Sequence, residues 1–163
     1  MNKLEKILES KAKIRFQDCD PFNHLNNAAY INYLINARED QLIAYYDIDI
    51  YKLGKTEGKS WVVGSNQIAY LRPAFLMEDV IIDSQLLGYT NSTIKVEMRM
   101  WNKDKTELKA VMWSTLVHFN LVKLRSEMHS DYFMDLFESV KYPIGISTFE
   151  DRIASLKPQK VTA

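Results

Sequence analysis

Two hydrophobic periodicities follow one another near the start of the chain. Polar and apolar residues alternate over residues 11–17, with Ala12, Ile14 and Phe16 on one side. This period of two predicts a half-buried strand. Residues 18–27 contain one Pro and three Asn, and this composition predicts a turn-rich loop.

The longest predicted helix covers residues 28–46, which contain neither Gly nor Pro. Asn26 or Asn27 can serve as its N-cap, because Asn side chains accept hydrogen bonds from the free N–H groups of a helix start. Apolar residues are spread around this helix and are not confined to a narrow stripe. Such a helix is usually buried on most sides, so we expect a curved sheet to wrap around it.

Four strand-like segments come after a polar connection over residues 47–60. Short turns separate them, and short turns join antiparallel strands because parallel pairing needs a long crossover. The order of a strand, a helix and four antiparallel strands predicts an α+β fold, with one long helix against one sheet. The predicted strands are residues 61–71, 80–87, 93–101 and 108–122.

A tail over residues 128–158 carries two short predicted helices. Aromatic and aliphatic residues recur at helical spacing over residues 132–140, and Pro143 lies beyond them. Ser147 and Glu150 form the S-x-x-E pattern of a capping box, which predicts a last helix. The sequence contains no internal repeat or low-complexity segment. We therefore expect one domain over residues 1–163, with its core in about residues 11–122.

The composition excludes several classes of function. Twenty-one basic residues balance twenty-one acidic ones, so bulk charge does not favour binding to nucleic acid or to an anionic membrane. No apolar run is long enough to span a membrane, and the charged N-terminal residues lack the apolar region of a secretory signal. The single Cys19 excludes an intrachain disulfide, and one Cys with three scattered His predicts no metal site. We expect a cytoplasmic protein.

Candidate chemistry is concentrated in the loop before the long helix. Asp20 and His24 lie in this loop, and Asn27 lies where the helix begins. Free N–H groups at a helix start can stabilise an oxyanion, and a loop carboxylate can fold back towards them. This combination suits thioester hydrolysis, because a thiol with a pKa of about 8.5 leaves without a strong general acid.

The same residues also have a structural interpretation. Asp followed by Pro is common in turns, so Asp20 can simply shape the loop. His24 can cap the helix or bond a carbonyl group, and Asn side chains are favoured caps in any protein. We expect Asp18 to be structural, and Tyr30 to belong to the core or to line a pocket.

The segment over residues 16–30 resembles the 4-hydroxybenzoyl-CoA thioesterase-like branch of the hot-dog superfamily. Residues 16–21, as F-x-D-C-D-P, resemble aromatic-acyl-CoA thioesterases, and residues 24–30, as H-x-N-N-x-x-Y, resemble broader acyl-CoA and acyl-carrier-protein thioesterases. Residues 70–74 and 78–80 are similar to the next strand junction of that family. The resemblance implies a hot-dog fold, in which an antiparallel sheet wraps around one long central helix, here with short C-terminal helices added.

This resemblance also implies residue roles. Asp20 matches the catalytic carboxylate, which acts as a general base or as a nucleophile. The backbone N–H of Asn27 matches the oxyanion donor, and His24 matches a position that orients water or the thioester in some members. We expect substrate binding by Tyr30 from the helix and by two residues of the strand junction. These two residues are Arg72 and Pro73.

The family further implies that coenzyme A enters only as part of the substrate, without a separate cofactor. Aromatic-acyl-CoA members carry basic residues in the turn that corresponds to residues 88–92, which here contains no Lys or Arg. Coenzyme A can instead be held by other cations, or the carrier can be acyl carrier protein. The candidate cations are Arg72, Lys103, Lys105 and Arg125.

Exposed strand edges are usually covered or paired, and the family pairs two sheets edge to edge with its active site between subunits. We therefore expect a homodimer or homotetramer, with the acyl pocket between the long helix and the sheet of the partner. Two other functions stay open. One is an acyl-thioester hydratase or dehydratase that uses Asp20 and His24, and the other is a non-catalytic acyl-CoA-binding domain. The acyl group itself is not specified by the sequence.

Overall fold

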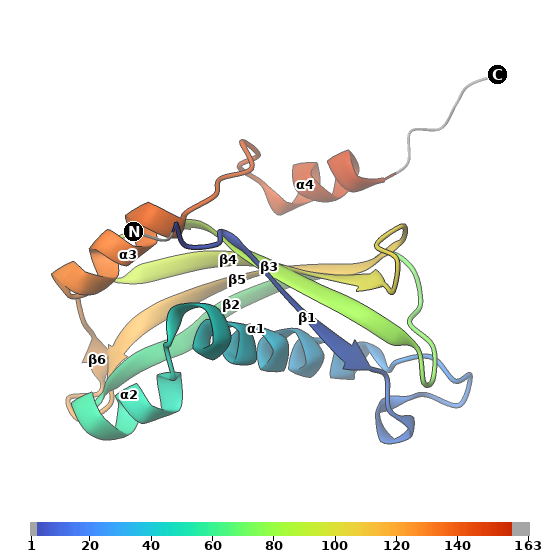
Figure 1. Ribbon diagram of the computed structural model, residues 1–163, viewed down its shortest axis with the longest axis horizontal. Helices are drawn as coiled ribbons and strands as arrows, with labels where there is room; N and C mark the ends of the chain where they lie inside the picture. The colour runs from blue at the N-terminus through green and yellow to red at the C-terminus, as the bar shows by residue number, and fades with distance from the viewer. Residues whose placement is uncertain (1–2, 158–163) are drawn as a thin grey trace.

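An antiparallel sheet curls around the longest helix, α1 (Tyr30–Tyr46), in the computed structural model (Figure 1). The structure describes residues 3–157. The strands follow the order β1-β3-β4-β5-β2, and β6 pairs with β5. This architecture confirms the expected α+β hot-dog arrangement. The strands are β1 (Ile7–Lys13), β2 (Lys59–Tyr70), β3 (Asp79–Tyr89), β4 (Thr93–Asn102), β5 (Leu108–Asn120) and β6 (Arg125–Ser126).

The first strand lies earlier in the chain than predicted. β1 pairs with β3 from Ile7 opposite Gln85 to Lys13 opposite Asp79, where β3 begins, so the ladder has no partner beyond Lys13. Residues 14–17 therefore leave the sheet, and Phe16 belongs to the short 3-10 helix η1 (Phe16–Asp18) with 78% of its surface exposed. The prediction that Phe16 belongs to this half-buried strand was wrong.

Helix α1 begins after a single 3-10 turn, η2 (Asn27–Ala29), capped by the Asn26 side chain. The capping prediction is confirmed for Asn26. The prediction that α1 is buried on most sides was wrong. Its buried residues form one stripe, and Ile43 and Tyr45 stay exposed in the single chain. The buried residues of α1 are Tyr30, Leu34, Ala37 and Gln41.

The four later strands match the predicted segments to within two residues at each end. Residues 47–60 were predicted as a polar connection without regular structure. This prediction was wrong in one respect, because the connection contains helix α2 (Ile50–Glu57). The Asp49 side chain caps α2 by accepting from the N–H groups of Tyr51 and Lys52, and Gly58 ends it in the left-handed conformation that favours glycine. The sequence also gave no signal for the two-residue β6.

The C-terminal tail folds into α3 (Asp131–Val140) and α4 (Phe149–Leu156), as predicted. The last helix is capped by Thr148, whose hydroxyl accepts from the N–H of Asp151 at 3.2 Å. The capping-box prediction for Ser147 and Glu150 was therefore displaced by one residue. Residue 158, the last of the predicted tail, lies outside the described residues.

The two faces of the sheet are covered by different elements. Helix α1 lies on the inner face, and α4 crosses the outer face (Figure 1). On the outer face, Phe149 of α4 packs against Trp113 of β5 with ring centroids 5.4 Å apart. The inner face forms the apolar core, whose members include Leu34, Ile82, Leu86, Val96, Met98, Met100 and Met112.

Strand β2 is an edge of the sheet, because it pairs only with β5. Six consecutive residues of β2, residues 62–67, are exposed in the single chain. No helix among residues 3–157 combines the length and the apolar character that a membrane crossing requires.

Candidate active site

The Asp20 carboxylate is fixed by the backbone of its own loop. Its Oδ1 accepts hydrogen bonds from the N–H groups of Phe22 at 2.9 Å and His24 at 3.0 Å. The Asp20 N–H donates to the His24 carbonyl oxygen at 2.8 Å. Within residues 3–157 no donor hydrogen-bonds to Oδ2, and the side chain is only partly buried. One oxygen therefore orients the carboxylate, and the other is available to a ligand.

The Asp20 loop is attached to the segment between β2 and β3 by backbone hydrogen bonds. The Leu25 N–H donates to the Ala74 carbonyl at 2.8 Å, and the Leu76 N–H donates to the Asn23 carbonyl at 2.9 Å. These bonds connect segments about fifty residues apart. They hold the loop in place against the sheet.

A buried lysine stabilises that β2–β3 segment. Lys109 has a side chain only 4% exposed, and its Nζ donates to the Pro73 carbonyl at 3.0 Å and lies 3.2 Å from Glu78 Oε2. Glu78 Oε1 accepts from the Phe75 N–H at 3.0 Å. The pattern of the sequence did not single out Lys109 or Glu78 for this role, because their pairing depends on the strand register.

The helix start presents a free donor beside this loop. The Asn26 side chain accepts from the Ala28 N–H at 3.0 Å, whereas the Asn27 N–H has no acceptor among the described residues. The Asn27 carbonyl oxygen accepts from the Tyr70 hydroxyl at 2.9 Å, which fixes this peptide against β2. An oriented and unused N–H at a helix start can stabilise negative charge.

His24 lies four residues after Asp20, but the two side chains do not form a hydrogen-bonded pair. Asp20 contacts the backbone N–H of His24. The imidazole ring instead packs edge-on against Phe75, with centroids 5.2 Å apart, and lies 6.5 Å from Phe22. Within residues 3–157 neither ring nitrogen forms a hydrogen bond.

The three residues expected to bind substrate differ in their exposure. Tyr30 is only 2% exposed, and its hydroxyl accepts from the Ala74 N–H at 3.1 Å. Burial raises the pKa of Tyr30, so this hydroxyl stays neutral. Arg72 and Pro73 are exposed at the end of β2, and Arg72 Nη1 lies 3.5 Å from Glu107 Oε1.

Asp18 has the structural environment that we expected for it. Its Oδ2 accepts from the Tyr33 hydroxyl at 2.6 Å, and that hydroxyl oxygen in turn accepts from the Arg15 N–H at 3.0 Å. Burial and the Asp18 hydrogen bond both raise the pKa of Tyr33. Asp18 therefore anchors the loop to α1.

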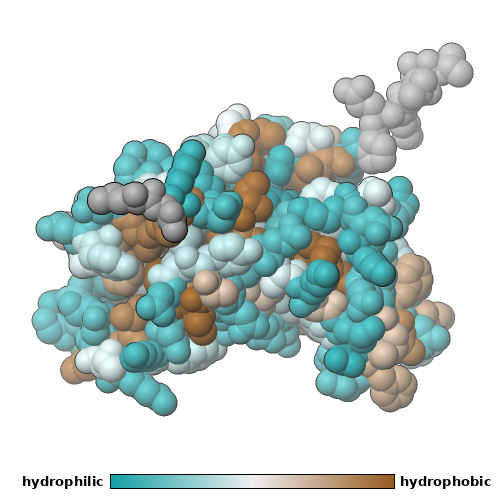
Figure 2. Space-filling view, viewed as in Figure 1, coloured by the Kyte–Doolittle hydropathy of each residue, from teal (hydrophilic) through white to brown (hydrophobic). Residues whose placement is uncertain are grey.

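Large apolar side chains surround the Asp20 loop on the surface. Phe16 and Phe22 are 78% and 77% exposed, and Phe75 and Met77 are also exposed. Figure 2 shows a mostly hydrophilic face with hydrophobic residues gathered at its lower right, where the loop between β1 and α1 lies in Figure 1. Exposed apolar patches of this kind commonly mark a binding surface.

An apolar cavity of about 150 Å³ lies farther along α1, between this helix, the inner face of β2–β5 and α3. Its polar lining residues are Arg38, Glu39 and Ser114. Ile35 and Val63 belong to the lining as well. Because Val63 is 47% exposed on the edge strand, this end of the cavity is close to the surface of the single chain.

Trp61 forms part of the cavity wall and is held by a buried histidine. The Trp61 Nε1–H donates to His129 Nε2 at 3.0 Å, and His129 Nδ1 lies 3.1 Å from the Thr90 carbonyl oxygen. Burial lowers the pKa of His129, so the ring is neutral and can accept from Trp61. His129 lies just before α3 (Asp131–Val140) and is only 7% exposed.

The turn between β3 and β4 is close to one cation that comes from elsewhere in the chain. Lys141, at the end of α3, lies with residues 87–91 around a shallow surface pocket. Its Nζ lies 6.0 Å from the Tyr89 ring centroid and 2.9 Å from Glu138 Oε2. The sequence could not indicate Lys141, because only the fold brings the end of α3 to this turn.

Comparison with known proteins places this fold and loop in a family. The model of the thioesterase-like superfamily matches residues 14–154. The long-chain acyl-CoA thioesterase FadM of Escherichia coli (strain K12) is 33% identical over 79 residues, which cover 48% of this chain and 58% of that relative's length.

Solved structures share the fold at low sequence identity. A 1,4-dihydroxy-2-naphthoyl-CoA thioesterase from Synechocystis has a TM-score of 0.74 at 9% identity, covering 84% of this chain and 99% of that one. The protein SAV2348 from Staphylococcus aureus, solved in complex with CoA, has a TM-score of 0.74 at 12% identity, covering 90% and 94%. With the family model matched over nearly the whole described chain, this protein belongs to the thioesterase-like superfamily.

Proposed function

We propose that this protein hydrolyses acyl thioesters, with coenzyme A as the carrier. The observation that carries the proposal is the Asp20 carboxylate, held by two backbone N–H groups through Oδ1 and left with a free Oδ2. Membership of the thioesterase-like superfamily and the similarity to FadM support the reaction type. The similarity to SAV2348, solved with CoA, supports this carrier over acyl carrier protein.

In the proposed reaction Asp20 Oδ2 takes a proton from water, and the hydroxide attacks the thioester carbonyl carbon. The Asn27 N–H stabilises the negative charge that develops on the carbonyl oxygen. The intermediate then collapses, the C–S bond breaks, and the thiolate leaves and takes up a proton. Its departure needs no strong acid, because a thiol has a pKa of about 8.5.

Asp20 can also act as the nucleophile and form a mixed anhydride that water then hydrolyses. A single turnover in heavy-oxygen water separates the routes. The base route puts the heavy oxygen directly into the released acid. In the nucleophile route, water that attacks the Asp20 carbonyl of the anhydride leaves the label in Asp20 and releases an acid that carries an unlabelled Asp20 oxygen. Label found in Asp20 by mass spectrometry of the peptide therefore identifies the nucleophile route.

We propose a homodimer in which a second copy covers the exposed edge of β2. Residues 62–67 are exposed along this edge, and Val62 and Val63 leave apolar surface in water. Unpaired edges of this length are usually covered in native proteins. A monomeric mass in light scattering at micromolar concentration would contradict this part of the proposal.

The acyl group is proposed to follow α1 from its start to the cavity. Ile31 and Ile35 are four residues apart and share one face of α1, and Asn27 lies in the 3-10 turn directly before this helix. Ile31 packs against the core, and Ile35 lines the cavity. An acyl chain whose carbonyl lies at Asn27 can thus run towards the cavity while the carrier stays outside.

The test is thiol release from a panel of short, long and aromatic acyl-CoAs. We expect release from at least one member, and the panel identifies the acyl class. Incubation with a crotonyl thioester distinguishes hydrolysis from the hydratase alternative. Hydration consumes the double bond but leaves the thioester bond intact, so it releases no thiol. Thermal stabilisation by every acyl-CoA without thiol release from any would instead support a non-catalytic binding domain and overturn the proposal.

A further inference from the structure

We propose that the cavity beside α1 binds an aliphatic chain whose far end carries a carboxylate, and that Arg38 pairs with this carboxylate. The ligand class that this assigns is the ω-carboxyacyl group. Its identity as a substrate rests on the proposed thioesterase function, whereas the carboxylate site itself does not.

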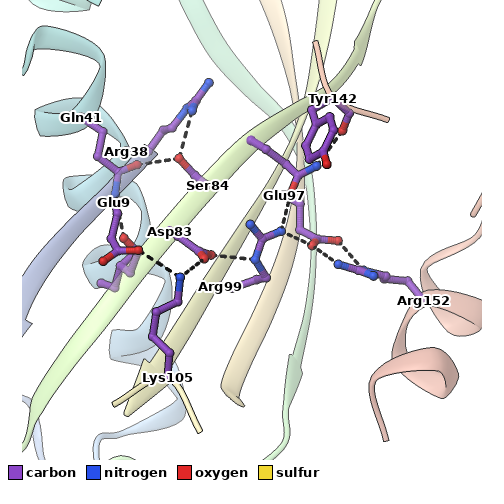
Figure 3. Close-up of polar contacts among 12 residues, drawn as sticks. Glu9, Arg38, Gln41, Asp83, Ser84, Glu97, Arg99, Lys105, Tyr142 and Arg152 are labelled. Atoms are coloured by element: carbon purple, nitrogen blue, oxygen red, sulfur yellow. Dashed lines mark hydrogen bonds and ion pairs between the residues drawn. The ribbon is translucent and has the colours of Figure 1, made fainter. Parts of the chain in front are cut away.

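Arg38 is held in a fixed position by a chain of buried polar groups (Figure 3). Its Nη1 donates to Ser84 Oγ at 2.9 Å. Ser84 Oγ donates to Gln41 Oε1 at 2.5 Å, and Gln41 Nε2 donates to the Ile82 carbonyl and to Ser10 Oγ, each at 2.9 Å. Ser84 is fully buried and Gln41 is 1% exposed. The guanidinium is therefore preorganised.

The Arg38 guanidinium lacks the counterion that comparable arginines have. Within residues 3–157, no carboxylate oxygen lies within 4.0 Å of its nitrogens. Arg99 and Arg152, by contrast, both contact carboxylates on the outer face of the sheet. Burial lowers the pKa of Arg38 to about 10, and Tyr46 has the opposite effect. A partly buried cation without a counterion favours binding of an anion.

The surroundings of Arg38 specify what kind of anion fits. The cavity lining is mostly apolar, so a ligand there must be largely aliphatic or aromatic. Glu39 accepts from the Tyr51 hydroxyl at 2.8 Å and is not paired with Arg38. Its negative charge weakens binding of an anion, so Glu39→Gln should tighten it.

The position of Arg38 along α1 sets the chain length. Arg38 lies about 18 Å from Asn27 along the helix axis, at roughly 2 Å per residue over the 3-10 turn η2 and roughly 1.5 Å per residue over α1. A thioester carbonyl at Asn27 therefore needs a medium-length chain to bring a terminal carboxylate to Arg38. A cavity of about 150 Å³ can hold the distal part of such a chain, since one of similar size accommodates benzene.

Binding is tested first, without any reaction. Trp61 lines the cavity, whereas Trp113 packs against α4 on the outer face, so a Trp101→Phe, Trp113→Phe background reports on Trp61 alone. Dodecanoate and dodecanol are titrated into this background and into its Arg38→Met, Arg38→Lys and Arg125→Met derivatives. Arg125 is an exposed residue of β6 and serves as the control, because the two ligands lack the coenzyme A for which Arg125 is a candidate cation.

We expect dodecanoate to bind at least about tenfold more tightly than dodecanol, because a charge-assisted hydrogen bond contributes roughly this much. Arg38→Met should abolish the preference, Arg38→Lys should keep part of it, and Arg125→Met should leave it intact. Equal affinities for the two ligands in the parent, or a preference that survives Arg38→Met, would overturn the proposal.

Kinetics then distinguish the source of the carboxylate. Thiol release is compared for dodecanoyl-CoA and its ω-carboxy analogue. A higher kcat/KM for the analogue that reverses in Arg38→Met identifies the ω-carboxyacyl chain as substrate. If only free dodecanoate binds through Arg38, the ligand is a product-like fatty acid and the ω-carboxyacyl assignment is overturned. Absence of thiol release with intact carboxylate binding refutes the proposed hydrolysis alone.

Discussion

The attachment of α4 to the outer face of the sheet depends on one arginine, and its removal has a calculable cost. Arg152 Nε and Nη2 donate to the two oxygens of Glu97 at 2.9 and 2.7 Å (Figure 3). Glu97 is completely buried. It also accepts from Trp113 Nε1 at 2.7 Å and from Arg99 Nη1. We predict that Arg152→Ala destabilises the fold and releases α4.

The magnitude follows from what remains around Glu97. Removing one partner of a buried ion pair costs about 3–5 kcal/mol when the remaining charge is left alone. In Arg152→Ala, Glu97 still accepts hydrogen bonds from Arg99 and Trp113. The variant therefore loses only two charge-assisted hydrogen bonds, and water in the vacated space partly replaces them. We therefore expect the free energy of unfolding to fall by about 2–3 kcal/mol.

The pH dependence provides a second test of the same pair. Burial raises the pKa of Glu97, but hydrogen bonds from Arg152, Trp113 and Arg99 outweigh it and the net shift is downward. Stability from a lowered carboxyl pKa is present above the unfolded pKa of about 4.3 and is lost as pH falls through the folded pKa. The difference in the free energy of unfolding between wild type and Arg152→Ala should therefore be largest near neutral pH and should shrink in acid.

Urea unfolding followed by circular dichroism measures both effects. Arg72→Ala is the matched control, because Arg72 is exposed and lies 3.5 Å from Glu107, an ion pair of a kind that contributes at most about 1 kcal/mol. The reasoning is refuted if Arg152→Ala costs no more than this control, or if its defect grows as the pH is lowered.

Three further predictions concern Lys109, Arg38 and Val62. Lys109→Met should lower the free energy of unfolding by about 2–4 kcal/mol, because Glu78 and the Pro73 carbonyl lose a buried donor; urea unfolding checks this, and an unchanged midpoint contradicts it. Arg38→Met should raise the stability of the ligand-free protein by about 1 kcal/mol, because an unpaired desolvated charge disappears; a lower melting temperature than wild type would count against it. Val62→Asp at the exposed edge of β2 should weaken the proposed dimer at least about tenfold, and sedimentation of an intact dimer at equal concentration would argue for a different interface.

The strands and the long helix could be predicted because their patterns are local. Strand-like segments between short turns marked β3, β4 and β5 to within two residues, and Asn26 marked the helix start. The first strand was misplaced because its length is set by where its partner β3 begins, which the alternation around Ile14 does not encode. Helix α2 was missed although Asp49 and Gly58 carried both of its end signals.

The candidate site could be predicted only as far as one loop. The motif around Asp20 identified a carboxylate that the structure leaves with a free oxygen. It could not show that His24 packs against Phe75, since those residues meet only through the fold. Arg38 was missed for the same reason: on a helix it resembles any solvated arginine, and only the missing carboxylate partner in the described chain distinguishes it.

The most direct test of the proposed reaction compares Asp20→Asn with Asp18→Asn in steady-state thiol release from the best acyl-CoA substrate. Asp18 is the matched control, because its carboxylate bonds the Tyr33 hydroxyl and an Asn side chain can accept the same bond. We expect Asp20→Asn to lower kcat by about 10²–10⁴-fold with an unchanged circular dichroism spectrum, and Asp18→Asn to stay within about tenfold of wild type. Equal turnover by wild type and Asp20→Asn would contradict the assignment of this carboxylate.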